Sequence, residues 1–152
     1  MSVEQRLSEL GITIPSAPKP VGAYVPAVVT GSLAFASGQA NTVDGKPTIT
    51  GKLGREISLE QGYDAARLAM INCLAELKAV LGTLDRVKRA VKVTGYVASA
   101  EGFVDQPKVI NGASELLLEI WGEAGKHARA AIGIAEVPGG CPVEVELIVE
   151  LQ

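Results

Sequence analysis

Nine residues near the C-terminus, Val143–Leu151, alternate between two kinds of side chain. Every odd position is Val or Leu, and three of the four even positions are Glu, the first of them Glu144. Successive side chains of a β-strand point to opposite faces, so this segment predicts a strand with one apolar face and one acidic face. Such strands belong to antiparallel sheets that helices cover on one side only. The uncovered side must face water or another subunit.

Length and composition predict a single globular domain. The chain has 152 residues, of which 47% are hydrophobic and 20% are charged. A chain of this length buries one core. No apolar run approaches the roughly 20 residues of a membrane helix, and the first residues lack the basic, apolar and small-residue order of a signal peptide. We therefore expect a cytoplasmic protein that does not associate with a membrane.

The net charge and the small numbers of aromatic residues, cysteines and histidines limit which ligands the protein can bind. The formal net charge is −3 and only 4% of residues are aromatic, whereas nucleic-acid binders usually carry a basic stripe and stacking aromatics. Cys73 and Cys141 form no C-x-x-C pair, and His127 is the only histidine, so no zinc site or disulfide framework is indicated. Cys73 falls in an apolar helical stripe, while Cys141, between Gly-Gly and Pro, is expected to be exposed. We expect no metal or other cofactor.

The first part of the chain predicts an extension, residues 1–20, before a domain of residues 21–152. The extension contains a short amphipathic helix within Ser2–Gly11. A segment with four prolines, Ile14–Pro26, predicts an extended arm that leads to Tyr24. Strand-like residues and turn signals then predict strands at Val25–Thr30 and Ser32–Gly38 and a short one near Thr48–Thr50.

Two long helices alternate with the remaining strands. Ser58 and Gln61 have the spacing of a capping box, and apolar residues recur at steps of three and four until Gly82. A strand at Val87–Ala98 follows. Asp105 can cap a second helix, which Gly125 is placed to stop. The predicted order is strands, helix, strand, helix and two final strands.

Two charged residues near the C-terminus are candidates for chemistry. Arg129 begins a predicted strand, and its guanidinium can bind a carboxylate or phosphate through two parallel hydrogen bonds. Glu144 can hold a water and take its proton as a general base. Each residue has a structural alternative, because Arg129 also suits an ion pair and Glu144 also suits the solvated side of a strand. His127 is more typical of a turn or an interface than of a catalyst.

Several short motifs, taken in their order and spacing, resemble the Rid (reactive intermediate deaminase) superfamily, also called the YjgF or L-PSP endoribonuclease family. The resemblance runs from Gly22 to Leu151, and each motif is weak alone. The motifs are Gly22-Ala-Tyr24, Ser37-Gly38-Gln39, Asn111 early in the second helix, Ala128-Arg129, and the Pro138 turn that leads to Val143-Glu144-Val-Glu146.

The resemblance implies an α+β fold of the chorismate-mutase-like (bacillary) type. It would have a mixed sheet with two helices packed on one face, and three chains would form a homotrimeric barrel with small-molecule clefts between subunits. Deaminating members hydrolyse 2-imino and 2-enamino acids to 2-oxo acids and ammonia, so a small carboxylate of this kind is the expected partner. The implied catalytic residues are Arg129 and Glu144, and the implied substrate-binding residues are Arg129, Tyr24, Gly38, Asn111 and Ala131.

The chain departs from the family pattern at three positions near this site. His127 stands where proline is common, Ala131 where cysteine is common, and Ser114 where tyrosine is common. Two other functions therefore stay open. One is binding or sensing of small carboxylates without turnover. The other, less expected for an acidic chain, is endoribonuclease activity supported by a basic cluster that comprises Arg86, Lys88, Arg89 and Lys92.

Overall fold

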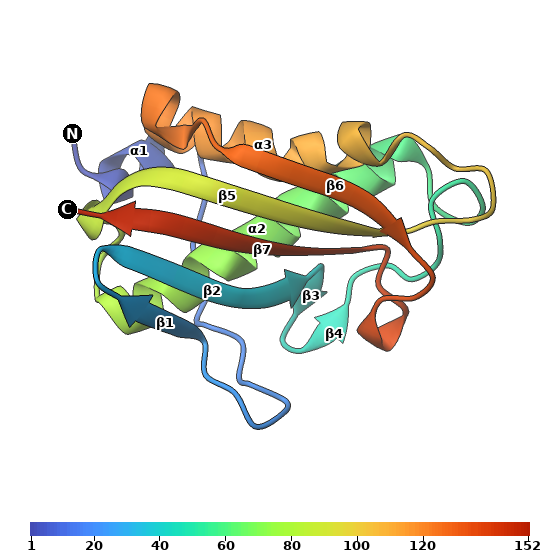
Figure 1. Ribbon diagram of the computed structural model, residues 1–152, viewed down its shortest axis with the longest axis horizontal. Coiled ribbons are helices and arrows are strands. Elements are labelled where there is room, and N and C mark those ends of the chain that lie inside the picture. The colour runs from blue at the N-terminus through green and yellow to red at the C-terminus, as the bar shows by residue number, and fades with distance from the viewer.

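The alternating C-terminal segment forms strand β7 (Val143–Leu151) in the middle of a five-stranded sheet (Figure 1). The computed structural model describes residues 1–152. The odd residues of β7 are at most 5% exposed, and its even residues are half-buried on the other face. The predicted alternation is confirmed, and the apolar face of β7 lies at the centre of the core.

The sheet is mixed. Its strands run in the order β1-β2-β7-β5-β6, in which β5 and β6 are parallel and all other neighbours are antiparallel. Both strands that follow the second helix therefore flank β5, and they do not pair with each other. The other bounds are β1 (Ala27–Thr30), β2 (Leu33–Ala40), β5 (Val87–Ala98) and β6 (Ala128–Ile134).

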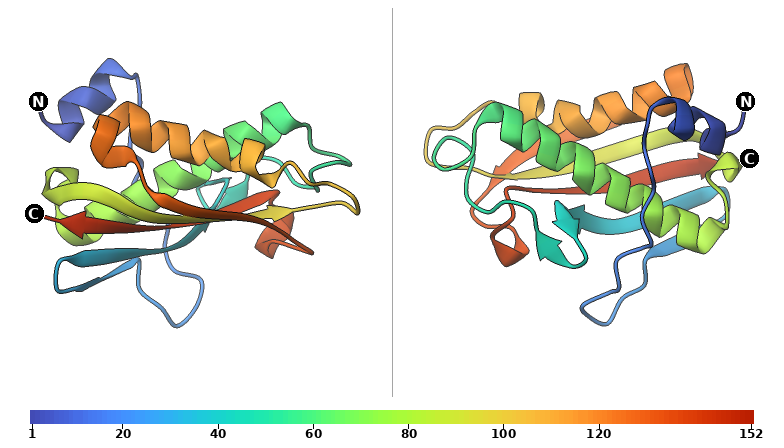
Figure 2. Two further views of the ribbon diagram at one scale, coloured as in Figure 1. Left: turned by 45° about the horizontal axis from the view of Figure 1, so that its top comes forward. Right: turned by 180° about the vertical axis from the view of Figure 1, so that it is seen from behind.

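Helices α2 (Leu59–Leu81) and α3 (Gln106–Trp121) cover one face of the sheet (Figure 2, left). The expected capping box is present at the start of α2, where Ser58 Oγ accepts a hydrogen bond from the Gln61 N–H at 3.1 Å. Gly82, with φ of +82°, ends this helix as predicted. The predicted α+β class, with two helices on one face of a mixed sheet, is confirmed. No helix of the protein combines the length and the apolar character needed to span a membrane.

The N-terminal extension is tied to the domain by helix α1 (Val3–Glu9). The Val3 N–H donates to Asp85 Oδ1 at 2.7 Å, and Arg6 Nε donates to the carbonyl oxygen of Glu119 at 2.8 Å. After α1 the chain crosses the outer side of α2 before it enters β1 (Figure 2, right). The short helix therefore packs beside α3, at the end of the domain where both termini lie (Figure 1).

Two details of the second helix differ from the prediction. Helix α3 ends at Gly122, which has φ of +58°, and a 3₁₀ turn at Gly122–Gly125 follows. Gly125 was expected to stop the helix, but the left-handed residue comes three positions earlier, and a left-handed glycine is the stronger stop. Asp105 occupies the position before the helix, yet its side chain makes no capping hydrogen bond.

The polar connection after β2 also differs from the prediction. Thr48–Thr50 forms no strand. Instead β3 (Thr42–Val43) and β4 (Lys46–Pro47) form a small hairpin around Asp44 and Gly45, whose φ angles are +52° and +77°. An Asp-Gly pair between short strands is a strong hairpin signal because both residues tolerate positive φ. The turn chemistry of Asp44 and Gly45 therefore determines the local structure here, rather than the β-propensity of the threonines.

Close contact between the two long helices depends on Gly112 of α3. A Cβ atom at this position would collide with the backbone carbonyl of Tyr63 in α2. Backbone cannot move aside as a flexible side chain can, so the helices would have to separate. At Gly62 of α2, by contrast, an added Cβ would meet the end of the Leu53 side chain, with Cδ1 at 2.8 Å.

We predict that Gly112→Ala destabilises the protein by about 2–3 kcal/mol, because an overpacked contact forces a backbone shift. Gly62→Ala is the matched control within a helix and should cost clearly less, since the Leu53 side chain can rotate. Urea unfolding followed by circular dichroism measures both. Equal free energies of unfolding for wild type and Gly112→Ala would show that the helices are not held at this distance.

Candidate functional site

The two predicted catalytic residues lie on opposite faces of the sheet. Residues paired in register point to the same face. Arg129 of β6 pairs with Val93 of β5, which is fully buried beneath the helices, so Arg129 lies on the helix-covered side. Glu144 of β7 pairs with Tyr96 of β5 on the uncovered side. Within one chain, therefore, Arg129 and Glu144 are separated by the sheet itself.

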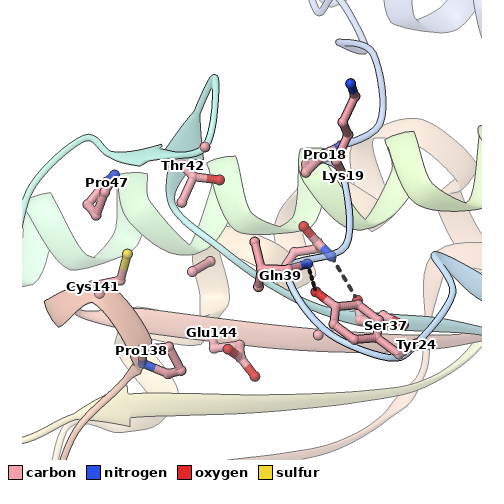
Figure 3. A pocket seen from close by; sticks show the side chains of 15 residues that line it. Pro18, Lys19, Tyr24, Ser37, Gln39, Thr42, Pro47, Pro138, Cys141 and Glu144 are labelled. Carbon is pink, nitrogen blue, oxygen red and sulfur yellow. Dashed lines mark hydrogen bonds between the residues drawn. The ribbon is translucent and has the colours of Figure 1, made fainter.

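The uncovered side contains a cavity of ≈ 600 Å³ (Figure 3). It lies between the start of β7, the second half of β2, the β3–β4 hairpin and the proline-rich arm. Three of the predicted site residues, Tyr24, Gly38 and Glu144, line it together. The remaining lining residues are Pro18, Lys19, Val21, Ser37, Gln39, Ala40, Thr42, Gly45, Pro47, Pro138, Gly139 and Cys141.

Gly38 allows the Glu144 carboxylate to lie against strand β2. A Cβ at residue 38 would be only 2.7 Å from Glu144 Oε2. Burial raises the pKa of Glu144 above its ordinary value of 4.5, and the neighbouring charge of Glu146 raises it further. Tyr96 Oη donates to Glu146 Oε1 at 2.7 Å, and this hydrogen bond, with burial, raises the pKa of Tyr96 to about 12. Glu144 is thus a carboxylate whose proton is held more tightly than usual.

Tyr24 lies at the rim of this cavity, on the arm that precedes β1 (Figure 3). The Val21 N–H donates to its hydroxyl at 3.3 Å, which folds the arm back on itself. Ser37 Oγ donates to the carbonyl oxygen of Val25 at 2.6 Å and fastens the arm to β2. Tyr24 is 45% exposed. It can therefore cover a molecule that enters the cavity.

Arg129 and Asn111 form the second group, at the edge of the sheet beside α3. Arg129 Nη1 donates to Asn111 Oδ1 at 2.8 Å and to Ser114 Oγ at 3.2 Å. Nη2 meets the carbonyl oxygen of Pro107 at 3.4 Å. Ala131 shares this face of β6, where its side chain packs against the core. The guanidinium is held by neutral oxygen atoms alone.

A histidine and a serine extend this group through a contact that was not predicted from the sequence. Ser114 Oγ lies 2.9 Å from His127 Nε2, and His127 Nδ1 lies 2.7 Å from the carbonyl oxygen of Gly125. The available signal was that Ser114 follows Asn111 by three residues, on the same side of a helix, and that His127 precedes Arg129 by two.

The remaining candidates have structural roles. Cys73 is fully buried as predicted, and its Sγ lies 3.3 Å from the carbonyl oxygen of Val145. Cys141 was expected to be exposed, but it is 1% exposed because it packs with Ala98 and Val137. In the basic cluster, Lys88 forms an ion pair with Glu150 at 3.1 Å. No group of three or more His, Cys, Asp or Glu residues is placed to hold a metal ion.

Comparison with known proteins identifies relatives along the whole chain. The family described as "YjgF/chorismate mutase-like, putative endoribonuclease" matches residues 4–151. Protein TCP17 of Trypanosoma cruzi is 42% identical over 151 residues, which cover 99% of this chain and 94% of the relative. A 2-iminobutanoate/2-iminopropanoate deaminase of Dermatophagoides farinae is 29% identical over 142 residues, or 93% of this chain and 95% of the relative.

A solved structure from Shewanella oneidensis MR-1, described as "a putative endoribonuclease", superposes with a TM-score of 0.95. It is 36% identical, and the match covers 99% of this chain and 100% of that one. The predicted chorismate-mutase-like fold is therefore confirmed together with the family resemblance. The chain belongs to the YjgF/Rid superfamily.

Proposed function

We propose that the protein hydrolyses 2-imino and 2-enamino acids to 2-oxo acids and ammonia, in clefts formed between the subunits of a homotrimer. The observation that carries the proposal is the pairing of complementary half-sites on one chain. In one half-site, neutral hydrogen-bond partners hold Arg129, whose positive charge can bind a carboxylate. In the other half-site, Glu144 lines a cavity and its pKa is raised. The relative named 2-iminobutanoate/2-iminopropanoate deaminase supports this reaction.

Assembly is part of the proposal because the sheet separates the two half-sites within one chain. The uncovered face carries exposed apolar side chains, among them Val28, Phe35 and Ile132. Burial of such side chains against another copy stabilises an interface. A symmetric ring repeats one heterologous contact, and such a contact can bring Arg129 of one subunit to Glu144 of its neighbour.

The chemistry then needs only orientation and proton transfer. Arg129 binds the substrate carboxylate and fixes the position of C2. A 2-enamino acid first takes up a proton from solvent at C3 and releases one from nitrogen, which gives the 2-imino acid. Glu144 then accepts a proton from water as the water oxygen attacks C2 and the C=N electron pair moves to nitrogen, which takes up a proton. The resulting carbinolamine loses ammonia and leaves the 2-oxo acid. A carboxylate with a raised pKa is better matched to proton exchange near neutral pH than an ordinary one.

Cleavage of RNA is disfavoured by the charges of the cavity. Glu144 lies there with Glu146 close enough to raise its pKa, and Lys19 is the cation among the lining residues. Two adjacent carboxylates repel a phosphate, whereas a small acid bound through its carboxylate by Arg129 can present its uncharged end to Glu144. A protein that binds small carboxylates without turnover would use the same two half-sites. The two functions differ in Glu144, which catalysis needs as a base and binding does not.

Removal of either charged residue should greatly slow deamination. A pyridoxal phosphate dehydratase can supply 2-aminoacrylate or 2-iminobutanoate in a coupled assay that records 2-oxo acid formation. We expect wild type to accelerate the reaction, and Arg129→Ala and Glu144→Gln to lower kcat/KM by about 100-fold or more. Lys88→Ala, which alters only the ion pair with Glu150, is the control and should match wild type.

The two variants also separate catalysis from binding. Glu144→Gln should still bind a 2-oxo acid such as 2-oxobutanoate, and Arg129→Ala should not. Saturable binding by wild type with no acceleration of the reaction would replace the deaminase by a carboxylate-binding protein. Acceleration by Arg129→Ala at the wild-type rate would contradict the site altogether.

The pH dependence should follow the ionisation of Glu144. A general base must be ionised, so kcat/KM should fall as pH falls through the raised pKa, above the ordinary value of 4.5. Glu146→Gln removes one cause of the increase, so its acid limb should move to lower pH. Glu150→Gln, on the same face but paired with Lys88, is the control and should leave the limb in place. An acid limb that Glu146→Gln does not move would contradict this assignment.

A composite site predicts complementation between two inactive variants. Co-expressed Arg129→Ala and Glu144→Gln chains should form mixed trimers in which about one quarter of the sites pair an intact arginine with an intact glutamate. Activity should therefore return to about one quarter of the wild-type value. Sedimentation should give a mass near three chains. A monomer, or mixed particles without activity, would show that no site is shared between subunits.

A further inference from the structure

A chain of hydrogen bonds connects the backbone at Gly125 to the guanidinium of Arg129. His127 Nδ1 lies 2.7 Å from the carbonyl oxygen of Gly125, His127 Nε2 lies 2.9 Å from Ser114 Oγ, and Ser114 Oγ lies 3.2 Å from Arg129 Nη1. Neither His127 nor Ser114 has a part in the deamination steps described above. The connection nevertheless ends on the residue that would bind the substrate.

The chemistry of the end groups determines where each proton lies. A carbonyl oxygen only accepts, so His127 Nδ1 must carry the proton that it shares with Gly125. In the neutral ring Nε2 is then an acceptor, and the hydroxyl of Ser114 donates to it. The oxygen of Ser114 keeps lone pairs that accept from Arg129 Nη1. Every link therefore has a defined direction, which runs from the arginine to the carbonyl.

The local backbone keeps this chain of groups in place. Ser114, in the middle of helix α3, is only 9% exposed. Gly125 is pressed against the same helix, since a Cβ there would collide with the carbonyl of Leu117. The carbonyl that holds His127 is thus fixed relative to the helix that carries Ser114. A fixed carbonyl at one end and a helical side chain at the other leave the imidazole little freedom.

Both hydrogens of Arg129 Nη1 are used, one by Asn111 Oδ1 at 2.8 Å and one by Ser114 Oγ. Nη2 meets only the Pro107 carbonyl, at the long distance of 3.4 Å. The edge formed by Nε and Nη2 has the parallel donors that a carboxylate accepts in a two-point contact. A long side chain that is already ordered loses less entropy when a ligand binds.

We propose that Ser114 and His127 are positioning residues that orient the guanidinium of Arg129 for the carboxylate of the substrate. The inference rests on the proposed carboxylate site, and it extends that site to two residues that do not touch the ligand. Loss of either one should weaken carboxylate binding without removing the charge that attracts the ligand. The effect should appear in KM, while kcat stays near the wild-type value.

The first test uses Ser114→Ala, His127→Phe and the double variant, with 2-oxobutanoate as the titrated ligand. We expect each single variant to weaken binding by about 3- to 10-fold, which is the usual net effect of losing one hydrogen bond. The double variant should be no worse than either single variant, because both changes break one chain of bonds. Lys126→Ala, an exposed neighbour paired with Glu123, is the control and should bind like wild type.

The second test needs neither substrate nor turnover. His127 is the only histidine, so its ring nitrogens give unambiguous signals in a long-range ¹H–¹⁵N spectrum recorded where the ring is neutral. We expect the proton on Nδ1, and a shift of the Nε2 signal in Ser114→Ala. The order parameter of the Arg129 Nε–H bond should be high in wild type and lower in Ser114→Ala and His127→Phe.

The outcomes separate this inference from the proposed function. A proton on Nε2, or an Arg129 Nε–H bond equally ordered in wild type and both variants, overturns the positioning role even if deamination is observed. Affinities unchanged in both variants, when Arg129→Ala abolishes binding, also overturn it. If wild type neither binds 2-oxobutanoate nor deaminates, the proposed function fails, and loss of Arg129 order in the variants still supports the positioning role.

Discussion

One-sided burial of the sheet is the constraint on which the rest of the structure depends. The odd residues of β7 are almost fully buried because α2 and α3 cover that face, and the helices approach closely at Gly112. The even residues, with Glu144 among them, are left on the other face. The same alternation that builds the core therefore places carboxylates and apolar side chains together on a surface that has no helices.

The order of the strands separates the two candidate catalytic residues within one chain. Because β5 lies between β6 and β7, and because Arg129 and Glu144 differ in the face on which they lie, no rotation of side chains can join them within one chain. A site that uses both must take them from different subunits. In the proposed function, catalysis and assembly are therefore linked through strand register, which a substitution in the core can disturb without touching either residue.

The sequence predicted what depends on periodicity and on local stop signals. It located β5, the ends of α2 and the buried face of β7, since each depends on residues close together in the chain. It did not predict the burial of Cys141 or the pairing of Ser114 with His127, because these depend on contacts between segments distant in sequence. Periodicity shows which side chains of a strand share a face, but the neighbouring strands determine which residues meet across the sheet.

Separation within the chain also preserves the charges that the site would use. An internal ion pair between Arg129 and Glu144 would lower the pKa of the carboxylate and occupy the guanidinium. Instead Arg129 is held by the neutral oxygens of Asn111, Ser114 and Pro107. Glu144 is influenced by burial and by Glu146, both of which raise its pKa. The positive charge of Arg129 therefore remains available to bind a carboxylate, and the carboxylate of Glu144 remains available to accept a proton from water.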